Sequence, residues 1–88
     1  MKYEEFMLKW RKLRDILGFT PALNNLIAMN GKKTINVIAL DMEISKRVPE
    51  YDGDNCTYKG KPNYSLKMMI SEHYGPETAE LVSELIKG

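Results

Sequence analysis

Residues 65–88 read SLKMMISEHYGPETAELVSELIKG, and this stretch decides the fold class. Ser65 is placed to cap a helix, and Pro76 is placed at the first position of the next helix, where its missing N–H is not needed. Apolar residues recur at helical spacing on both sides of the single glycine that joins the two segments: Leu66, Met69 and Ile70, then Leu81, Val82, Leu85 and Ile86. The stretch therefore predicts helices over 66–74 and 76–87.

Two further helices are predicted from their ends and their apolar spacing. The helix over 3–17 is followed by Gly18, a residue suited to the position just beyond a helix end. Its apolar stripe is Tyr3, Phe6, Met7, Trp10, Leu13 and Leu17. The helix over 21–30 begins at Thr20-Pro21 and ends at Asn30-Gly31. Trp10 is interpreted first as a core residue of the 3–17 helix.

Residues 34–48 fit two patterns. With Thr34 as the cap, the helical stripe is Val37, Leu40, Ile44 and Val48. The alternating residues of a half-buried strand over 35–44 are Ile38, Leu40, Met42 and Ile44. The helix is favoured, because most residues of the segment are good helix formers. The strand remains the alternative.

Residues 49–64 contain two of the four prolines and two of the six glycines, with no helical period. Thr57-Tyr58-Lys59 and Lys61 are expected to form a small hairpin around Gly60. The expected fold is a mainly α domain of four to five short helices with a loop or a small β-hairpin at about 49–64. A strand over 35–44 would make it α+β.

Length and composition fit a single domain over 1–88, with 43% hydrophobic residues, 28% charged residues and a net charge of +1. The longest unbroken apolar runs have four residues, whereas a membrane-spanning helix needs about 20. Eight of the first fifteen residues are charged, which is unsuited to a secretory signal. We therefore expect a cytoplasmic protein that does not bind membranes.

Few residues are suited to catalysis or to metal binding. Cys56 and His73 are the single cysteine and the single histidine, so an internal disulfide and the common zinc arrangements are excluded. The chain has no glycine-rich phosphate loop, and the acidic run Glu50, Asp52 and Asp54 lacks the calcium-loop pattern. We expect a protein that is not an enzyme and needs no metal and no cofactor.

The run Tyr58-Lys-Gly-Lys61 followed by Tyr64-Ser-Leu-Lys67 resembles a phrase common in small proteins of bacteria and their phages. The resemblance covers about ten residues and consists of a short hairpin that leads into a capped helix. It implies a bacterial or phage accessory protein, and it includes no catalytic residues.

The expected function is non-catalytic binding of a protein partner whose action the chain modulates, as a monomer or a homodimer. Loops carry aromatic groups outward, and tyrosine often dominates interface energetics. The candidate partner-binding residues are Tyr51, Tyr58, Lys59, Lys61, Tyr64 and Met68. In the alternative interpretation, the three tyrosines close the loop over the helices and leave only their hydroxyls in water.

A small DNA- or RNA-binding regulator is the alternative function. Its basic face on the first helix is formed by four cations around Trp10: Lys9, Arg11, Lys12 and Arg14. Such a patch binds phosphates while an aromatic ring stacks on a base. The last predicted helix is unsuited to reading DNA, because Glu77, Glu80 and Glu84 would repel a phosphate backbone.

Overall fold

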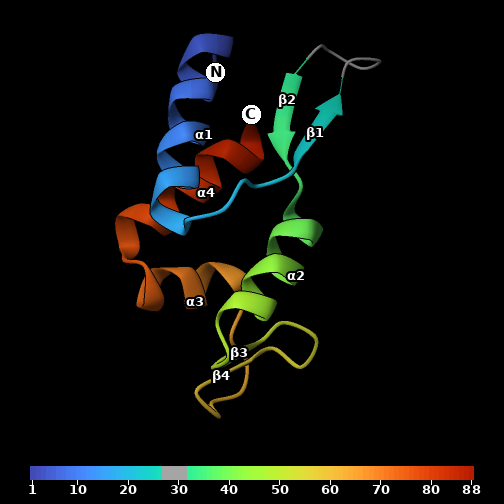
Figure 1. The fold of residues 1–88 in the computed structure, drawn as a ribbon, viewed down its shortest axis with the longest axis vertical. Helices are drawn as coiled ribbons and strands as arrows, with labels where there is room; N and C mark the ends of the chain where they lie inside the picture. Colours follow the sequence, from blue (N-terminus) through green and yellow to red (C-terminus); the bar gives the residue numbers. More distant parts are fainter. Residues whose placement is uncertain (27–31) are drawn as a thin grey trace.

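A computed structural model of the chain describes residues 1–26 and 32–88 (Figure 1). The described residues form four helices and two antiparallel two-stranded sheets. In chain order the elements are α1 (Tyr3–Leu17), β1 (Leu23–Leu26), β2 (Lys32–Ile35), α2 (Val37–Arg47), β3 (Tyr51–Asp52), β4 (Thr57–Tyr58), α3 (Leu66–His73) and α4 (Pro76–Lys87). The predicted class, a small mainly helical domain with a hairpin in 49–64, is confirmed.

The predicted helix ends explain α1, α3 and α4. Ser65 caps α3, since its Oγ accepts a hydrogen bond from the Met68 N–H at 3.2 Å. Gly18 ends α1 at a φ of +80°, a value suited to glycine, and its N–H donates to the Arg14 carbonyl at 2.9 Å. Helix α4 packs against α1, α3 and β2 and so lies at the centre of the fold (Figure 1).

The helix predicted over 21–30 is wrong, because Leu23–Leu26 is strand β1. It pairs antiparallel with β2 from Leu23↔Ile35 to Leu26↔Lys32. Tertiary contacts override the local helical signal here, since β2 packs on α4 and buries Ile35. The helix end predicted at Asn30-Gly31 lies outside the described residues.

Residues 37–47 are helical, so the favoured interpretation of 34–48 is confirmed and the strand alternative is wrong. The cap is Asn36 rather than Thr34: its side-chain oxygen accepts from the Ala39 N–H at 3.1 Å. Thr34 is instead buried in β2. Leu40 and Ile44 are buried as predicted, whereas Val37 is exposed.

The loop at 49–64 contains a small hairpin as predicted, but Thr57–Tyr58 pairs with a strand that precedes it and not with residues after Gly60. β4 pairs with β3 in the register Tyr51↔Tyr58 and Asp52↔Thr57. The expected pairing around Gly60 is reduced to a bridge in which Tyr58 and Lys61 exchange backbone hydrogen bonds of 3.0 and 2.9 Å. A two-stranded hairpin is marginal alone and is stabilised here by packing on the helices.

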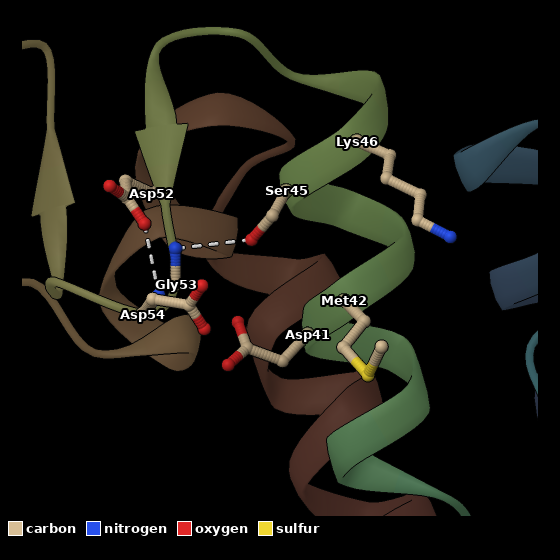
Figure 2. A pocket seen from close by; sticks show the side chains of 7 residues that line it. All are labelled: Asp41, Met42, Ser45, Lys46, Asp52, Gly53 and Asp54. Carbon is tan, nitrogen blue, oxygen red and sulfur yellow. Dashed lines mark hydrogen bonds between the residues drawn. The ribbon is translucent and has the colours of Figure 1, made fainter.

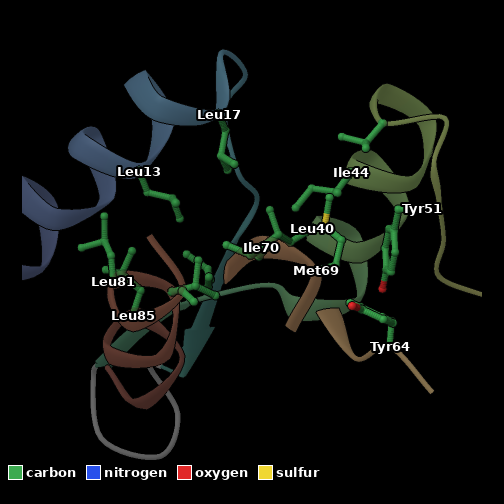
Figure 3. Packing of buried hydrophobic residues seen from close by; sticks show 14 of the residues in the cluster. Leu13, Leu17, Leu40, Ile44, Tyr51, Tyr64, Met69, Ile70, Leu81 and Leu85 are labelled. Carbon is green, nitrogen blue, oxygen red and sulfur yellow. The ribbon is translucent and has the colours of Figure 1, made fainter. Parts of the chain in front are cut away.

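One continuous cluster of buried side chains joins the helices and both sheets (Figure 3). Leu13 of α1 and Leu85 of α4 lie toward one end of it, and Ile44 of α2 and Tyr51 of β3 lie toward the other. The molecule measures 40 × 23 × 19 Å. Along the longest axis, α1 and the β1–β2 hairpin occupy one end and the β3–β4 hairpin the other (Figure 1).

Candidate functional site

The three loop tyrosines are buried, with exposed fractions of 3% for Tyr51, 2% for Tyr58 and 8% for Tyr64. Each hydroxyl meets a polar group of a helix. The Tyr51 hydroxyl donates to Asp41 at 2.6 Å and the Tyr64 hydroxyl to Glu72 at 2.7 Å, while the Tyr58 hydroxyl lies 3.3 Å from Nδ1 of His73. The tyrosines therefore close the loop over the helices, and the expectation that they point outward is wrong.

The hydroxyl contacts affect the acidity of two of these tyrosines. Burial, followed by the hydrogen bond to Asp41, raises the pKa of the Tyr51 phenol. The hydrogen bond to Glu72 is the main cause that raises the pKa of the Tyr64 phenol. Both phenols stay protonated near neutral pH, so both remain hydrogen-bond donors to their carboxylates.

The other three candidate partner-binding residues are exposed. Lys59 and Lys61 flank the turn at Gly60, and the Lys59 ammonium lies 5.4 Å from the centre of the Tyr58 ring. Met68 lies in the first turn of α3 with 49% of its surface exposed. These residues are available to a partner, but their apolar surface is limited to one methionine.

The basic face of α1 is partly neutralised within the chain. Lys9 forms ion pairs with Glu84 of α4 and, at 3.6 Å, with Glu5, and the pair with Glu84 is the main cause that raises the Lys9 pKa. Arg14 lies 3.4 Å from Asp15. Among the described residues, Arg11 forms no ion pair, and neither does Lys12.

Trp10 is half-buried and packs against the core, as the core interpretation predicts. Its Nε1 donates to the Pro21 carbonyl at 3.3 Å, and the Arg14 guanidinium lies 5.7 Å from the ring centre. The ring therefore holds α1 against the segment that leads to β1.

A groove of about 310 Å³ lies between α1 and α4. We call it the α1–α4 groove, and its charged lining residues are Lys9, Lys12, Glu77, Glu80 and Glu84. Cations from α1 and carboxylates from α4 thus face one groove, and the groove contains the Lys9–Glu84 ion pair.

A second pocket, of about 320 Å³, lies between α2 and the turn after β3 (Figure 2). We call it the α2 pocket. Its lining residues are Asp41, Met42, Ser45 and Lys46 of α2 and residues 52–54 of the turn. Sequence reasoning missed this pocket, because it is built from segments that only the fold brings together.

Gly53 allows the turn to approach α2 closely. The Gly53 N–H donates to Ser45 Oγ at 3.1 Å. A Cβ atom at Gly53 would lie 2.7 Å from Asp41 Oδ1 and 2.8 Å from Ser45 Oγ, closer than side chains normally pack. A side chain at this position would have to displace the ends of the Asp41 and Ser45 side chains, and the hydrogen bond from Gly53 joins the turn to the helix.

The carboxylates of the α2 pocket have neutral hydrogen-bond donors. Asp52 accepts from the N–H of Asp54 at 3.0 Å and from the Asn55 side chain at 2.7 Å, and the bonds from Asn55 lower the Asp52 pKa. Asp41 accepts from the Tyr51 hydroxyl. Lys46 is the single cation in the lining, and its ammonium lies 3.8 Å from Glu43 outside the pocket.

Two large apolar side chains of α2 point to the surface, opposite the buried Leu40 and Ile44. We call them the α2 face: Ile38 and Met42, which are 75% and 56% exposed. Val37, which is 36% exposed, lies on the same side of the helix as Leu40 and Ile44. Ile38 and Met42 are four residues apart and so adjoin on the helix. This spacing is the signal in the sequence that could have identified the face. Ile38 and Met42 are, however, also part of the alternating apolar pattern that would fit a strand over 35–44.

The described residues show neither a metal centre nor a membrane-spanning helix. No group of three or more His, Cys, Asp or Glu side chains among them is arranged to hold a metal ion. None of their helices is both long enough and apolar enough to cross a membrane. No protein-family model matches the sequence, and searches of curated proteins and of solved structures find no match either.

Proposed function

We propose that the chain is a non-catalytic binding protein of the cytoplasm that attaches to a protein partner through the α2 face and modulates it. The observation that carries the proposal is the exposure of Ile38 and Met42, 75% and 56%, on a helix whose opposite side buries Leu40 and Ile44. In a chain of 88 residues, apolar side chains are needed for the core, so two large ones that adjoin at the surface favour a binding role.

The composition of the face supports this proposal. Methionine is enriched at protein interfaces, and its flexible thioether adapts to the shape of a partner. Met42 also lines the α2 pocket, so the apolar surface continues into a concave region. Interfaces commonly combine an apolar centre with a polar rim, which Asp41 and Lys46 would supply.

A role in bacterial or phage biology is the second part of the proposal. It rests on the resemblance of residues 58–67 to small accessory proteins of these organisms. In that setting the protein would inhibit or modulate its partner by occupying a surface, without chemistry of its own. Lys59, Lys61 and Met68 are exposed and remain further candidates for contacts with a partner.

Nucleic-acid binding through Lys9, Arg11, Lys12 and Arg14 is less well supported. The Lys9 and Arg14 charges are paired within the chain, and the carboxylates of α4 border the same groove. A phosphate backbone would have to compete with the pairs and approach those carboxylates. We therefore treat DNA or RNA binding as an outcome of the test.

The test compares capture of proteins from a bacterial lysate by the immobilised wild-type chain and by two surface variants. Ile38→Asp places a charge on the α2 face, and Leu8→Asp is the matched control, because Leu8 is 65% exposed on α1. We expect a stoichiometric protein that is lost with Ile38→Asp and retained with Leu8→Asp. Circular dichroism should show both variants folded.

Two results would overturn the proposal. The first is equal capture by wild type and Ile38→Asp. The second is steeply salt-dependent binding to DNA or RNA that Ile38→Asp leaves intact and that Arg11→Ala with Lys12→Ala removes.

A further inference from the structure

The α2 face and the α2 pocket form one surface. Ile38, Met42 and Ser45 are spaced by four and three residues and therefore follow one side of the helix. Met42 belongs to both regions, since it is exposed on the face and lines the pocket (Figure 2). A segment that packs on Ile38 and Met42 is thus placed at the opening of the pocket.

The wall of the α2 pocket is preorganised by hydrogen bonds within the chain. The hydrogen bond from Gly53 to Ser45 fixes the turn on α2, and the turn is tightened by Asp52, which accepts from two backbone N–H groups. The Tyr51 hydroxyl holds the Asp41 carboxylate. Because these groups are already positioned, a ligand would not have to order them on binding.

The charge of the lining selects the ligand. The lining includes three carboxylates, those of Asp41, Asp52 and Asp54, and a single ammonium, that of Lys46, which points away from them toward Glu43 (Figure 2). The hydrogen-bond donors to Asp41 and Asp52 are neutral, so they do not cancel the negative charge. Among the described residues, no side chain donates to the Asp54 carboxylate, and Figure 2 shows it beside Asp41. The pocket is complementary to a cation.

We propose that the α2 face binds an amphipathic segment of a partner protein, whose apolar residues cover Ile38 and Met42 and whose lysine or arginine side chain enters the α2 pocket. This inference rests on the proposed function and adds the chemistry of the partner. The guanidinium of arginine fits best, because its several N–H groups can bond to carboxylates from α2 and from the turn together.

The probes are two synthetic peptides of equal length with the same leucine stripe, one with arginine and one with glutamate on its polar side. Titrations are followed by NMR with the full chain, through the backbone amides of Met42 and Gly53. We expect the arginine peptide to shift both amides and to bind at least tenfold more tightly than the glutamate peptide. Asp54→Lys should remove this preference without unfolding the chain.

The control variant is Glu80→Lys, which makes the same charge change in the α1–α4 groove and should leave the preference intact. Equal binding of the two peptides, no binding of either, or an equal effect of Glu80→Lys would overturn the inference. A second copy of the chain is the other molecule that could cover the α2 face. If sedimentation shows a dimer and Ile38→Asp dissociates it, the inference of a cationic partner segment would also be overturned.

The two proposals fail in different ways. If Ile38→Asp abolishes capture while the two peptides bind alike, the α2 face remains the docking surface and only the cationic partner is excluded. If Ile38→Asp leaves capture unchanged, the proposed function falls, whatever the peptides do.

Discussion

The α1–α4 groove and the α2 pocket are similar in size, about 310 and 320 Å³, but their charges are arranged differently. In the groove, cations of α1 face carboxylates of α4, and Lys9 is paired with Glu84. In the pocket, carboxylates from two segments lie together and bond to neutral donors. The first surface has charges of both signs and one ion pair across it, whereas the second has three carboxylates and no ion pair to them among the described residues.

The comparison shows why a count of charged residues is a poor guide to binding. Residues 1–49 carry the excess of lysine and arginine, which makes the basic face of α1 prominent in the sequence. The fold places α4 beside that face and reduces its net charge.

The largest expected effect tests whether the two regions belong to one folding unit. Ile44→Ala removes a fully buried side chain near the α2 pocket, and Leu85→Ala removes one near the α1–α4 groove. Each should lower the free energy of unfolding by about 3 to 4 kcal/mol, as large-to-small changes in a core do. Because the buried cluster is continuous, urea denaturation should show a single transition in both variants.

Circular dichroism and the NMR signal of the Gly53 amide should report the same midpoint for each variant. A variant in which one region unfolds while the other keeps its signals would break the comparison, since the two pockets would then belong to separate units.

The next effect concerns the side of the molecule that contains the groove. Trp10→Ala should lower stability by about 3 kcal/mol, the lower end for a large aromatic residue, because the ring is only half-buried. Trp10→Phe is the matched control that keeps an aromatic ring and loses the bond to the Pro21 carbonyl. Thermal denaturation should rank wild type, Trp10→Phe and Trp10→Ala in that order. An unchanged melting temperature for Trp10→Ala would contradict the core role.

A smaller effect is expected at the wall of the α2 pocket. Gly53→Ala adds a Cβ atom within 2.8 Å of Ser45 Oγ and even closer to Asp41. The atoms that this Cβ meets are the ends of the Asp41 and Ser45 side chains, so relief of the overlap should move these ends, weaken the hydrogen bonds that they accept, and cost about 1 kcal/mol. Asp54→Ala, in the same turn, is the control and should leave the melting temperature near that of the wild type. Equal stability of Gly53→Ala and wild type would show that the close approach is not required.

The smallest effect is a pH dependence confined to the pocket. The bonds from Asn55 hold the pKa of Asp52 below its unfolded value of about 3.9. This contribution to stability is therefore present above that pH and is lost as the pH falls through the folded pKa. Asn55→Ala removes the side-chain donor and should raise the Asp52 pKa in an NMR titration of the carboxyl carbons. An unchanged Asp52 pKa in Asn55→Ala would contradict the role of the Asn55 side chain as its donor.

Local chemistry made three helices predictable. Ser65 and Gly18 mark the ends of α3 and α1 by capping groups that act within a few residues, and Pro76 marks the start of α4 in the same way. The β1–β2 pair was not predicted, because its stability depends on pairing and on burial of Ile35 against α4.

The candidate site was less predictable than the fold. Asp41 and Asp54 are thirteen positions apart in the sequence, and their proximity depends on the close approach at Gly53. Tyr51 could not be placed from its residue type, because a tyrosine suits an interface and a half-polar core equally well. In the structure its hydroxyl bonds to Asp41, so Tyr51 belongs to the core. Sequence patterns identify such residues, but they do not determine which way the side chains point.

The two ends of the described chain meet: the amino group of Met1 donates to the Gly88 carbonyl at 3.2 Å. A short linker could therefore join them into a ring without distorting α1 or α4. Cyclisation would leave the native contacts unchanged and would restrict the unfolded chain, which raises stability by reducing the entropy gained on unfolding. Both ends lie away from the β3–β4 hairpin (Figure 1), so a circular form would keep the surface beside α2 open.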